Sequence, residues 1–371
     1  MSNPGRNDYL SFVLDKAIRL NQLEKEEVLY LLSLDNKNEI EQLFNAARQV
    51  RSGNFSDRIF LYGFIYFSTY CRNDCTFCYY RRSNSISGRY RKTADQVLET
   101  SKKLADSGVH LLDLTMGEDP LYFNSGQFEE LINLTEMAKK ATGLPVMISP
   151  GAISREVLNS FKNIDVDWYA CYQETHNREL YKTLRLSQDY DERLNIKSYA
   201  RKAGLLTEEG ILAGIGESTE DIYNSFVAMR DLDANQVRVM SFVPQQGTPF
   251  ENHQAVQSDY ELIIIAVMRL LFPDKLIPAS LDVEGINGLE RRLNAGANVV
   301  TSIIPSEDGL LGVSQSTLDI EEGGRTVDGI APVLKRCGLQ PATLQQYLEW
   351  IERAKHNSGN GLFTSSAQQS C

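Results

Sequence analysis

The sequence predicts an α/β protein built as a (β/α)8 TIM barrel, with an N-terminal helical cap and a short C-terminal extension. Short apolar runs alternate with longer amphipathic helical segments, which is the pattern of a parallel sheet with helical crossovers. Eight such runs can be counted, and 371 residues suit one barrel of this kind. We therefore divide the chain into a cap over residues 1–51, a barrel over 52–312 and an extension over 313–371.

Helical periodicity in the cap predicts three helices, over residues 9–20, 24–34 and 39–50. The barrel strands are expected at residues 59–67, 110–115, 146–149, 168–172, 211–213, 236–242, 276–279 and 298–303.

Two helix starts inside the barrel fix the register of this count. Thr93 and Gln96 form a capping box, and Ser218 with Asp221 forms its acidic variant. Beyond Gly312 the chain is acidic and irregular until a last helix near residues 344–355. The Ser/Gly/Gln-rich tail, residues 357–371, is expected to be disordered.

Composition excludes several classes of partner. The formal net charge is −11, and no basic block or RNA-binding signature is evident, so a nucleic-acid partner is not expected. The most apolar helical stretch, residues 261–272, is too short to span a bilayer and carries Arg269. Without a secretory signal, the chain is expected to be cytoplasmic, with no membrane partner.

Three cysteines stand within eight residues, directly after the first predicted strand. Cys71, Cys75 and Cys78 have the spacing C-x3-C-x2-C. Their loop would open at the carboxyl end of the strand, which is where barrel enzymes have their active sites. Three thiolates from one short loop can converge on a single metal centre. An iron-sulfur cube normally takes four ligands, so one iron would stay open.

Two other readings of the cysteines are weaker. A zinc site would need a fourth Cys or His, usually in a second pair, and Cys171, Cys337 and Cys371 stand alone. A disulfide framework is less favoured still, because a chain of this length can bury its own core.

Glycines and acids follow several of the other strands. Gly117 and Glu118 come after the second strand, where a glycine lets the backbone approach a ligand closely. Glu174 ends the fourth strand, where a carboxylate suits a ribose diol or an ammonium group. Gly214 and Gly216 close the fifth strand. A lone G-x-G motif is weak evidence for a binding site, but this one ends a strand of the same barrel as the cysteine loop, which strengthens the interpretation.

Charged side chains also occupy strand positions expected to face the barrel mouth. Arg238 lies in the sixth strand, Ser280 and Asp282 share one side of the seventh, and Asp113 comes from the second. A guanidinium can clamp a carboxylate, and two carboxylates suit two ammonium groups, so a diamino acid such as lysine or ornithine is complementary. The alternative is a structural Arg-Asp pair inside the barrel.

Taken together, these motifs resemble the methylornithine synthase family of radical S-adenosylmethionine (SAM) enzymes, in the biotin synthase-like branch. The resemblance rests on residues 64–71, 113–120, 147–151, 172–175, 237–240, 245–249, 277–282 and 292–297. The chain departs from the family's Gly-Gly-Glu motif at Met116, which stands in the place of the first glycine.

The resemblance implies a [4Fe-4S] cluster held by the three cysteines, SAM on its open iron, and a reductant protein. It places SAM against Phe77, Gly117, Glu118, Ser149, Glu174, Arg193, Gly214 and Gly216. Arg185 competes with Arg193 for the SAM carboxylate.

The resemblance also implies an isomerase that converts L-lysine to (3R)-3-methyl-D-ornithine, the first step of pyrrolysine biosynthesis. The reaction would fragment and rejoin the substrate under a SAM-derived 5′-deoxyadenosyl radical, so no protein residue is assigned a catalytic role. Asp113, Arg238, Ser280 and Asp282 would hold the fragments. The nearer alternative is another enzyme of the biotin synthase or hydrogenase maturase branch acting on a different amino-acid-like substrate. The remote one is a non-enzymatic iron-sulfur scaffold.

Overall fold

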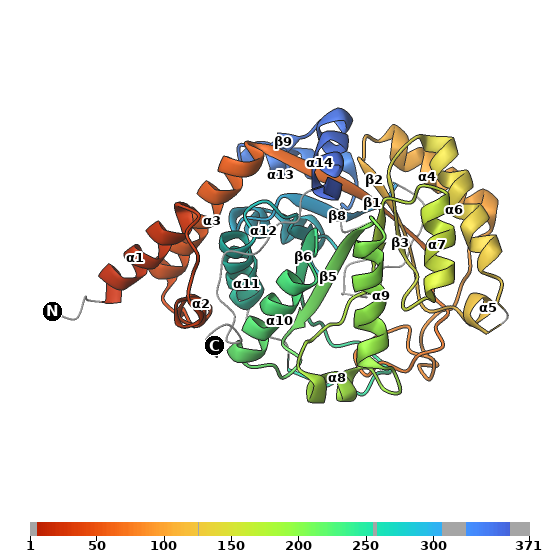
Figure 1. Cartoon of the computed structure of the whole chain (residues 1–371), viewed down its shortest axis with the longest axis horizontal. Coiled ribbons are helices and arrows are strands. Elements are labelled where there is room, and N and C mark those ends of the chain that lie inside the picture. The colour runs from red at the N-terminus through yellow and green to blue at the C-terminus, as the bar shows by residue number, and fades with distance from the viewer. Residues whose placement is uncertain (1–5, 125, 255–257, 306–323, 357–371) are drawn as a thin grey trace.

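Parallel strands form the inner wall of a barrel, and helices cover its outside (Figure 1). The computed structural model describes residues 6–124, 126–254, 258–305 and 324–356. Within these residues the strands follow the order β6-β5-β4-β3-β2-β1-β8-β7. Their bounds are β1 Arg58–Ser68, β2 Leu111–Met116, β3 Val146–Ser149, β4 Trp168–Ala170, β5 Leu206–Ala213, β6 Gln236–Ser241, β7 Pro278–Ser280 and β8 Val299–Ile303.

The barrel closes between β6 and β7. The backbone N–H of Val237 donates to the carbonyl of Leu276 (2.9 Å), and the N–H of Leu276 donates to that of Asn235 (3.1 Å). The predicted (β/α)8 barrel is therefore confirmed. The fifth strand was predicted too short, because its first half contains Thr207 and two buried glutamates that interrupt the apolar run.

Strand β1 separates the two parts of the core. Phe60, Tyr62, Phe64 and Tyr66 point into the barrel, and the alternate residues pack against the outer helices. Gly63 sits on the outer face, where an added Cβ would lie 3.0 Å from the side chain of Leu104 in helix α4, Ala94–Asp106. The inward aromatic row leads from the closed end of the barrel to its open mouth.

The outer helices are α4 Ala94–Asp106, α5 Pro120–Phe123, α6 Phe128–Thr142, α7 Arg155–Asn163, α8 Arg178–Leu184, α9 Tyr190–Lys202, α10 Thr219–Asp231, α11 Ser258–Leu271 and α12 Leu289–Asn294, with a 3₁₀ turn over Gly285–Asn287. Both predicted capping boxes are present, on α4 and α10.

The N-terminal helices α1 Arg6–Ile18, α2 Lys25–Leu32 and α3 Lys37–Phe55 project from one side of the barrel (Figure 1). Helix α3 packs on α11, and Arg51 of α3 donates to the carbonyl of Ala297 (3.2 Å). Arg269 of α11 is fully buried and donates to the carbonyls of Gly296 and Pro273 (3.0 Å each). None of the helices among the described residues combines the length and apolar character needed to cross a membrane.

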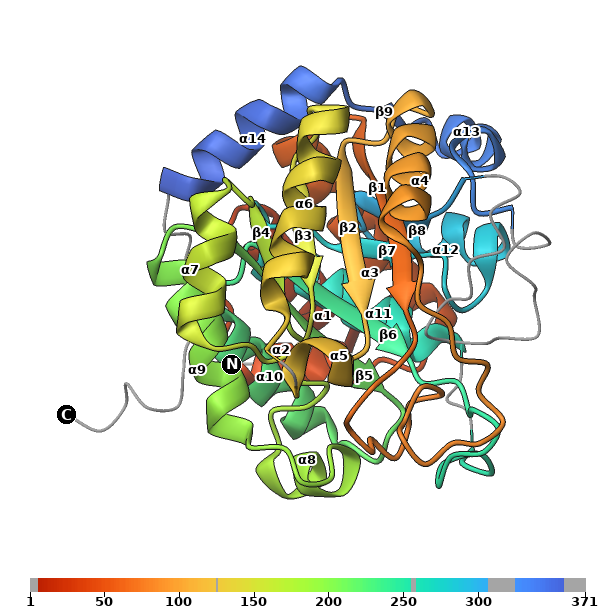
Figure 2. The same ribbon diagram turned by 90° about the vertical axis from the view of Figure 1, so that its right-hand side faces the viewer.

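The C-terminal segment covers the end of the barrel opposite the cysteine loop (Figure 2). It contains α13 Val327–Arg336, β9 Gln340–Pro341, which pairs with the start of β1, and α14 Leu344–His356. Helix α14 was predicted, but α13 and β9 were not: Pro332 lies inside α13 and obscures its helical pattern. The expected disordered tail, residues 357–371, lies outside the described residues.

Aromatic stacking closes this end. The Trp350 ring of α14 lies parallel to that of Trp168 in β4, with an interplanar angle of 5° and centroids 5.8 Å apart. Tyr347 stacks on the same tryptophan, Trp350, and its hydroxyl lies 2.7 Å from that of Tyr62. The barrel is therefore plugged at the amino ends of its strands and open at the carboxyl ends.

Candidate functional site

A cavity of about 240 Å³ lies at the carboxyl ends of the strands, the end at which parallel barrels bind ligands. It brings together all but three of the residues singled out in the sequence. Those lining it are Cys71, Cys75, Phe77, Cys78, Asp113, Gly117, Glu118, Ser149, Glu174, Arg193, Arg238 and Asp282. Gly214, Gly216 and Ser280 do not line it.

The loop that carries the cysteines leaves the end of β1 and is fixed by its own residues and by α8. The backbone N–H of Thr76 donates to the carbonyl of Leu184 (2.9 Å). Within the loop, the guanidinium of Arg89 donates to the carbonyls of Thr69 (2.6 Å) and Tyr80 (2.8 Å). These bonds hold the loop over the barrel mouth without using a cysteine side chain.

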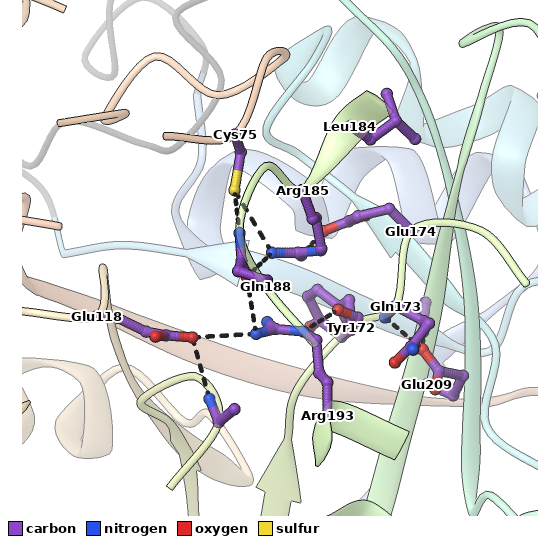
Figure 3. Close-up of polar contacts among 12 residues, drawn as sticks. Cys75, Glu118, Tyr172, Gln173, Glu174, Leu184, Arg185, Gln188, Arg193 and Glu209 are labelled. Carbon is purple, nitrogen blue, oxygen red and sulfur yellow. Dashed lines mark hydrogen bonds and ion pairs between the residues drawn. The ribbon is translucent and has the colours of Figure 1, made fainter. Parts of the chain in front are cut away.

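Two N–H donors point at the sulfur of Cys75. Gln188 Nε2 lies 3.0 Å from Cys75 Sγ and Arg185 Nη1 lies 3.7 Å from it (Figure 3). Burial raises the pKa of Cys71 to about 11 and also raises that of Cys78, so these two side chains are thiols and would lose their protons on binding iron.

The donor set fits a cluster better than a single ion. In the part of the chain that the structure describes, no three His, Cys, Asp or Glu side chains gather closely enough to hold one metal ion such as zinc. Three thiols around one cavity suit an iron-sulfur cube, in which each iron takes its own thiolate, and N–H donors to sulfur are a usual part of such sites.

Two glycines allow close packing beside the cysteines. A Cβ on Gly117 would lie 2.4 Å from the carbonyl oxygen of Tyr70, at the start of the cysteine loop. Gly151 has φ +91°, and a Cβ there would lie 2.2 Å from Cγ of Glu118. Met116, in the place of the family's first glycine, also lines the cavity. Because Gly117 has no side chain, the end of β2 can approach the cysteine loop closely.

Glu118 is held as a carboxylate by several donors. Arg193 Nη1 and Arg72 Nε each lie 3.0 Å from one of its oxygens, and the N–H of Ala152 donates at 3.1 Å. Burial acts to raise the pKa of Glu118, but Arg193 and the other donors outweigh it and keep that pKa below its ordinary value. Arg193 also donates to the carbonyl of Tyr172 (2.7 Å), which fixes its guanidinium (Figure 3).

Glu174 occupies a left-handed backbone conformation at the end of β4, with φ +69°. It is anchored on β5, where its N–H donates to the carbonyl of Gly210 (3.0 Å) and its carbonyl accepts from Leu212 (2.9 Å). Its carboxylate pairs with Arg185 at 2.6 Å. The structure therefore contains two acid–arginine pairs at the mouth, Glu174 with Arg185 and Glu118 with Arg193.

Deeper in the cavity, Arg238 has a buried counter-ion that the sequence interpretation missed. Its Nε lies 2.6 Å from Glu208 Oε1, and both side chains are almost fully buried. Glu208 also accepts from the hydroxyl of Tyr172 (2.8 Å). Residues two apart in a strand share a face, so Glu208 and Gly210 lie on one face of β5. This alternation could have indicated that Glu208 faces Arg238, but the fifth strand was predicted to begin only at Ile211.

Asp282 also has a charged partner from outside the predicted set. Arg325, just before α13, lies 2.6 Å from its carboxylate, and the hydroxyls of Tyr66 and Ser302 donate at 2.7 Å each. The hydroxyl of Ser280 lies 3.3 Å from the same carboxylate but does not line the cavity. Burial acts to raise the pKa of Asp282, but Arg325 and the hydroxyls hold it below its ordinary value.

Three buried polar atoms of the residues that line the cavity have no hydrogen-bond partner among the described residues, and one of them is Arg185 Nε beside the cysteine loop. Asp113 Oδ1 accepts from Ser149 (2.8 Å), but Asp113 Oδ2 is unpaired. Arg238 Nη2 is unpaired as well. Buried polar atoms are rarely left unsatisfied, so one acceptor and one donor facing one cavity fit a ligand that carries both an ammonium and a carboxylate.

Arg238 and Asp282 do not pair with each other, but the alternative of a structural Arg-Asp pair is met at Asp282, whose partner is Arg325. Arg238 and Asp282 each have a buried counter-ion of their own.

The glycines after β5 lie beside the cavity. Gly214 and Gly216 have φ of +90° and +104°. The carboxylate of Glu217 accepts from the N–H groups of Gly214 (2.7 Å) and Ile215 (2.8 Å), which fixes this turn. Ile215 packs with the partly buried Phe77 of the cysteine loop. The turn therefore borders the cysteine side of the mouth.

Comparison with known proteins finds relatives that cover most of the chain. Residues 65–226 match the model of the Radical SAM superfamily. The chain is 44% identical over 333 residues to the 3-methylornithine synthase of Methanosarcina acetivorans, covering 90% of this chain and 94% of the relative. It is 45% identical over 328 residues to that of Methanosarcina barkeri, covering 88% and 93%.

A solved structure extends the comparison to the fold. The crystal structure of a methylornithine synthase aligns with a TM-score of 0.87 and 43% identity, covering 91% of this chain and 99% of that chain. The [FeFe] hydrogenase maturase subunit of Thermotoga maritima is more distant, at 29% identity over 78% of this chain and 82% of the relative.

Proposed function

Because the chain belongs to the 3-methylornithine synthase family of radical SAM enzymes, we propose that it converts L-lysine into (3R)-3-methyl-D-ornithine, the first step of pyrrolysine biosynthesis. The observation that carries the substrate class is the pair of unpaired atoms in one cavity, Asp113 Oδ2 and Arg238 Nη2. An amino acid offers an ammonium group to the first and a carboxylate to the second.

Cys71, Cys75 and Cys78 would hold the [4Fe-4S] cluster and leave one iron for SAM. When bound, the cluster and SAM together supply a carbon-centred radical that removes a hydrogen atom from the substrate. Gln188 and Arg185 direct N–H groups at the Cys75 sulfur, where they would meet the sulfur of a cluster ligand. A reductant protein would deliver the electron that starts each reaction.

SAM would lie between the cysteine loop and the ends of β2 to β5. The residues proposed to hold it are Phe77, Gly117, Glu118, Ser149, Glu174, Arg193, Gly214 and Gly216. Arg193 is the better partner for the SAM carboxylate, because both terminal nitrogens of Arg185 already donate, to Glu174 (2.6 Å) and Gln188 (3.3 Å). Glu118, held as a carboxylate beside Arg193, would accept from the SAM ammonium.

The substrate would be held at its ends by Arg238, Asp113 and Asp282, and Ser280 would act through the Asp282 carboxylate, to which its hydroxyl donates (3.3 Å). Fragmentation and rejoining require that neither fragment diffuses away, and fixed charges at both ends provide that restraint. Glu208 and Arg325 act here as positioning residues, since Glu208 fixes the Arg238 guanidinium and Arg325 fixes the Asp282 carboxylate.

The reaction itself can be tested anaerobically with reconstituted cluster, SAM, dithionite and L-lysine. We expect mass spectrometry to find a product with the mass of lysine and a different retention time. Release of 5′-deoxyadenosine without a lysine isomer would mean that lysine is not the substrate. Turnover of a thioether or another amino acid would favour an enzyme of the biotin synthase or hydrogenase maturase branch. If SAM were not cleaved in the presence of any amino acid, the alternative of a non-enzymatic iron-sulfur scaffold would be favoured.

Substitution of Arg238 tests the carboxylate site. Arg238→Ala should weaken lysine binding by roughly 30-fold or more, because a buried, hydrogen-bonded charge contact is lost, while iron content stays at the wild-type level. Isothermal titration and iron analysis measure the two quantities.

The single variant leaves Glu208 buried without its partner, so a second variant is needed as a control. Arg238→Met combined with Glu208→Gln removes both charges and should restore thermal stability but not lysine binding. Wild-type turnover by either variant would remove Arg238 from the substrate site.

A further inference from the structure

A buried ion pair lies behind the wall of the cavity, on the outer face of β5. Glu209 follows Glu208 in this strand and therefore points to the opposite face, toward α9. Its carboxylate pairs with the ammonium group of Lys197 in α9, and both side chains are fully buried. Neither Glu209 nor Lys197 lines the cavity, so neither can touch a ligand there.

Such a pair is a poor source of stability, because apolar side chains of similar volume are often as stable or more stable in its place. The imidazole of His176 lies 3.8 Å from the Glu209 carboxylate. Burial lowers the pKa of His176 to about 4, so the imidazole is neutral and Lys197 is the cation that balances Glu209. The hydrogen bonds that the pair makes indicate a more specific role than stability.

These hydrogen bonds converge on Gln173, three residues beyond the end of β4. The backbone N–H of Gln173 donates to Glu209 Oε1 at 2.8 Å (Figure 3). Its side-chain oxygen accepts from Lys197 Nζ at 2.8 Å, and its side-chain nitrogen donates to the carbonyl of Tyr190 at 2.9 Å. Gln173 is fully buried, so the pair and α9 fix both its backbone and its side chain.

The neighbours of Gln173 on both sides belong to the cavity. The carbonyl of Tyr172 accepts from Arg193 Nε at 2.7 Å. The carboxyl-bearing Glu174 lines the cavity and has φ +69°. A positive φ is unfavourable for a residue with a side chain, so the conformation of Glu174 needs support from its surroundings. The bonds that fix Gln173 give that support from the adjacent residue.

Lys197 also acts on the helix that carries Arg193. It stands four residues after Arg193 in α9, so both side chains project from one face of the helix, toward the barrel. The bond from Lys197 to Glu209 fixes that face against β5. One turn away, the guanidinium of Arg193 lies 3.0 Å from Glu118. The ion pair thus contacts both segments that carry residues proposed to hold SAM.

We propose that Glu209 and Lys197 are positioning residues for SAM. By holding Gln173, they set the orientation of Glu174 and Arg193 in the cavity. This role rests on the proposed function, because it requires SAM to bind at those two residues. The hydrogen bonds carry the role, since a buried backbone N–H that loses its acceptor makes the conformation around it unfavourable.

The test measures SAM affinity by anaerobic isothermal titration of the cluster-loaded protein. Lys197→Met combined with Glu209→Leu, the apolar variant, removes the charges and the acceptor together. Lys197→Met combined with Glu209→Gln, the amide variant, removes the charges but keeps an oxygen that can accept from the N–H of Gln173. A comparison of the two variants separates the hydrogen bond from the charge.

Lys16→Met combined with Glu27→Leu is the matched control. Lys16 and Glu27 form a pair of the same residue types between α1 and α2, at 2.7 Å. Glu27 also accepts a backbone N–H, from Glu24 at 2.7 Å. None of these three residues lines the cavity, so the control should bind SAM like the wild type.

We expect the apolar variant to bind SAM roughly 10-fold or more weakly, the loss that is usual when the partners orienting a binding group are removed. The amide variant should recover most of the affinity. Without SAM, hydrogen–deuterium exchange across residues 172–175 should be faster in the apolar variant than in the wild type or the control. Iron content should stay at the wild-type level in all of them, because no cysteine is changed.

Wild-type SAM affinity in the apolar variant would overturn the role, and so would equal losses in the apolar and amide variants or in the apolar variant and the control. If the apolar variant did not fold, Gln173→Leu would carry the test, because it leaves the ion pair in place and removes only side-chain bonds. It should weaken SAM binding roughly 3-fold or more, and wild-type affinity would again overturn the role.

Failure of the proposed function would appear separately. Wild-type protein would then bind SAM normally but form no lysine isomer, whatever the affinities of the variants.

Discussion

Asp113 and Asp282 are buried in the same cavity, yet their surroundings drive their pKa values apart. Burial raises the pKa of Asp113 to about 8, and among the described residues only the hydroxyl of Ser149 donates to it to oppose this rise. Asp282 faces Arg325 and two donor hydroxyls, which hold its pKa low in spite of burial. At neutral pH one carboxyl group is therefore mostly protonated and the other charged.

The raised pKa of Asp113 predicts that lysine binding releases a proton. An ammonium group at Asp113 favours the carboxylate, so below pH 8 the carboxyl must lose its proton when lysine binds. Affinity should rise by up to about tenfold per pH unit between pH 6 and 8 and then level off. Isothermal titration in buffers of different ionisation enthalpy should count close to one released proton at pH 6.5.

Asp113→Asn provides the control, because an amide of similar shape does not titrate in this range. The variant should bind lysine more weakly, with no change in affinity between pH 6 and 8. A wild-type affinity that is flat over the same range would show that Asp113 does not meet an ammonium group.

At the residue scale, the sequence predicted the side chains that face the cavity but not their partners. Arg238 and Asp282 follow from strand alternation and a local motif. Glu208 and Arg325 do not, because they come from other segments and become neighbours only when the barrel and the C-terminal segment pack together. Which arginine would meet the SAM carboxylate was also open, and the structure places both Arg185 and Arg193 in the lining of the cavity.

Among the elements, the end of β2 and the cysteine loop fit together through Gly117. A Cβ there would lie 2.4 Å from the carbonyl oxygen of Tyr70, so Gly117→Ala must push the loop outward. We expect a loss of about 1–3 kcal/mol in stability from overpacking, and a lower content of iron and sulfide per chain. Thermal unfolding and iron analysis measure the two effects.

Gly53→Ala is the matched control for this substitution. Gly53 lies exposed in α3, and a Cβ added there would have no atom within 4 Å, so alanine meets no obstacle. It should stabilise the protein by about 0.5–1 kcal/mol through helix propensity and leave iron content unchanged. Equal iron loss in both variants would contradict the packing role of Gly117.

Element positions were predictable where the signal is local. The capping boxes of α4 and α10 and most strands follow from a few neighbouring residues. The first half of β5 was missed because Glu208 and Glu209 are charged, and their burial depends on Arg238 and Lys197 from other elements. Helix α13 was missed because Pro332 and Gly329 weaken its pattern.

Across the whole molecule, chemistry and closure lie at opposite ends of the barrel. Trp350 seals the amino ends of the strands by stacking on Trp168, and the cavity opens at the carboxyl ends. Trp350→Ala should lower stability by about 3–5 kcal/mol, as for other large-to-small core changes. Turnover measured well below the melting temperature should stay at the wild-type level.

Leu348→Ala, on the same helix, is the control for this change. Leu348 is 36% exposed and is not part of the aromatic stack that Trp350 forms with Trp168. It should alter stability by less than about 1 kcal/mol. If Trp350→Ala abolished turnover while the protein remained folded by circular dichroism, the separation of the two ends would be wrong.

Arg325 limits how far this enzyme can be treated as a module. It lies outside the eight strands, yet it clamps Asp282 at the end of β7 and the carbonyl of Ser302 in β8. A barrel excised after β8 and grafted elsewhere would carry a buried carboxylate without its cation. Any minimal engineered version of the enzyme therefore has to keep the C-terminal segment together with the barrel.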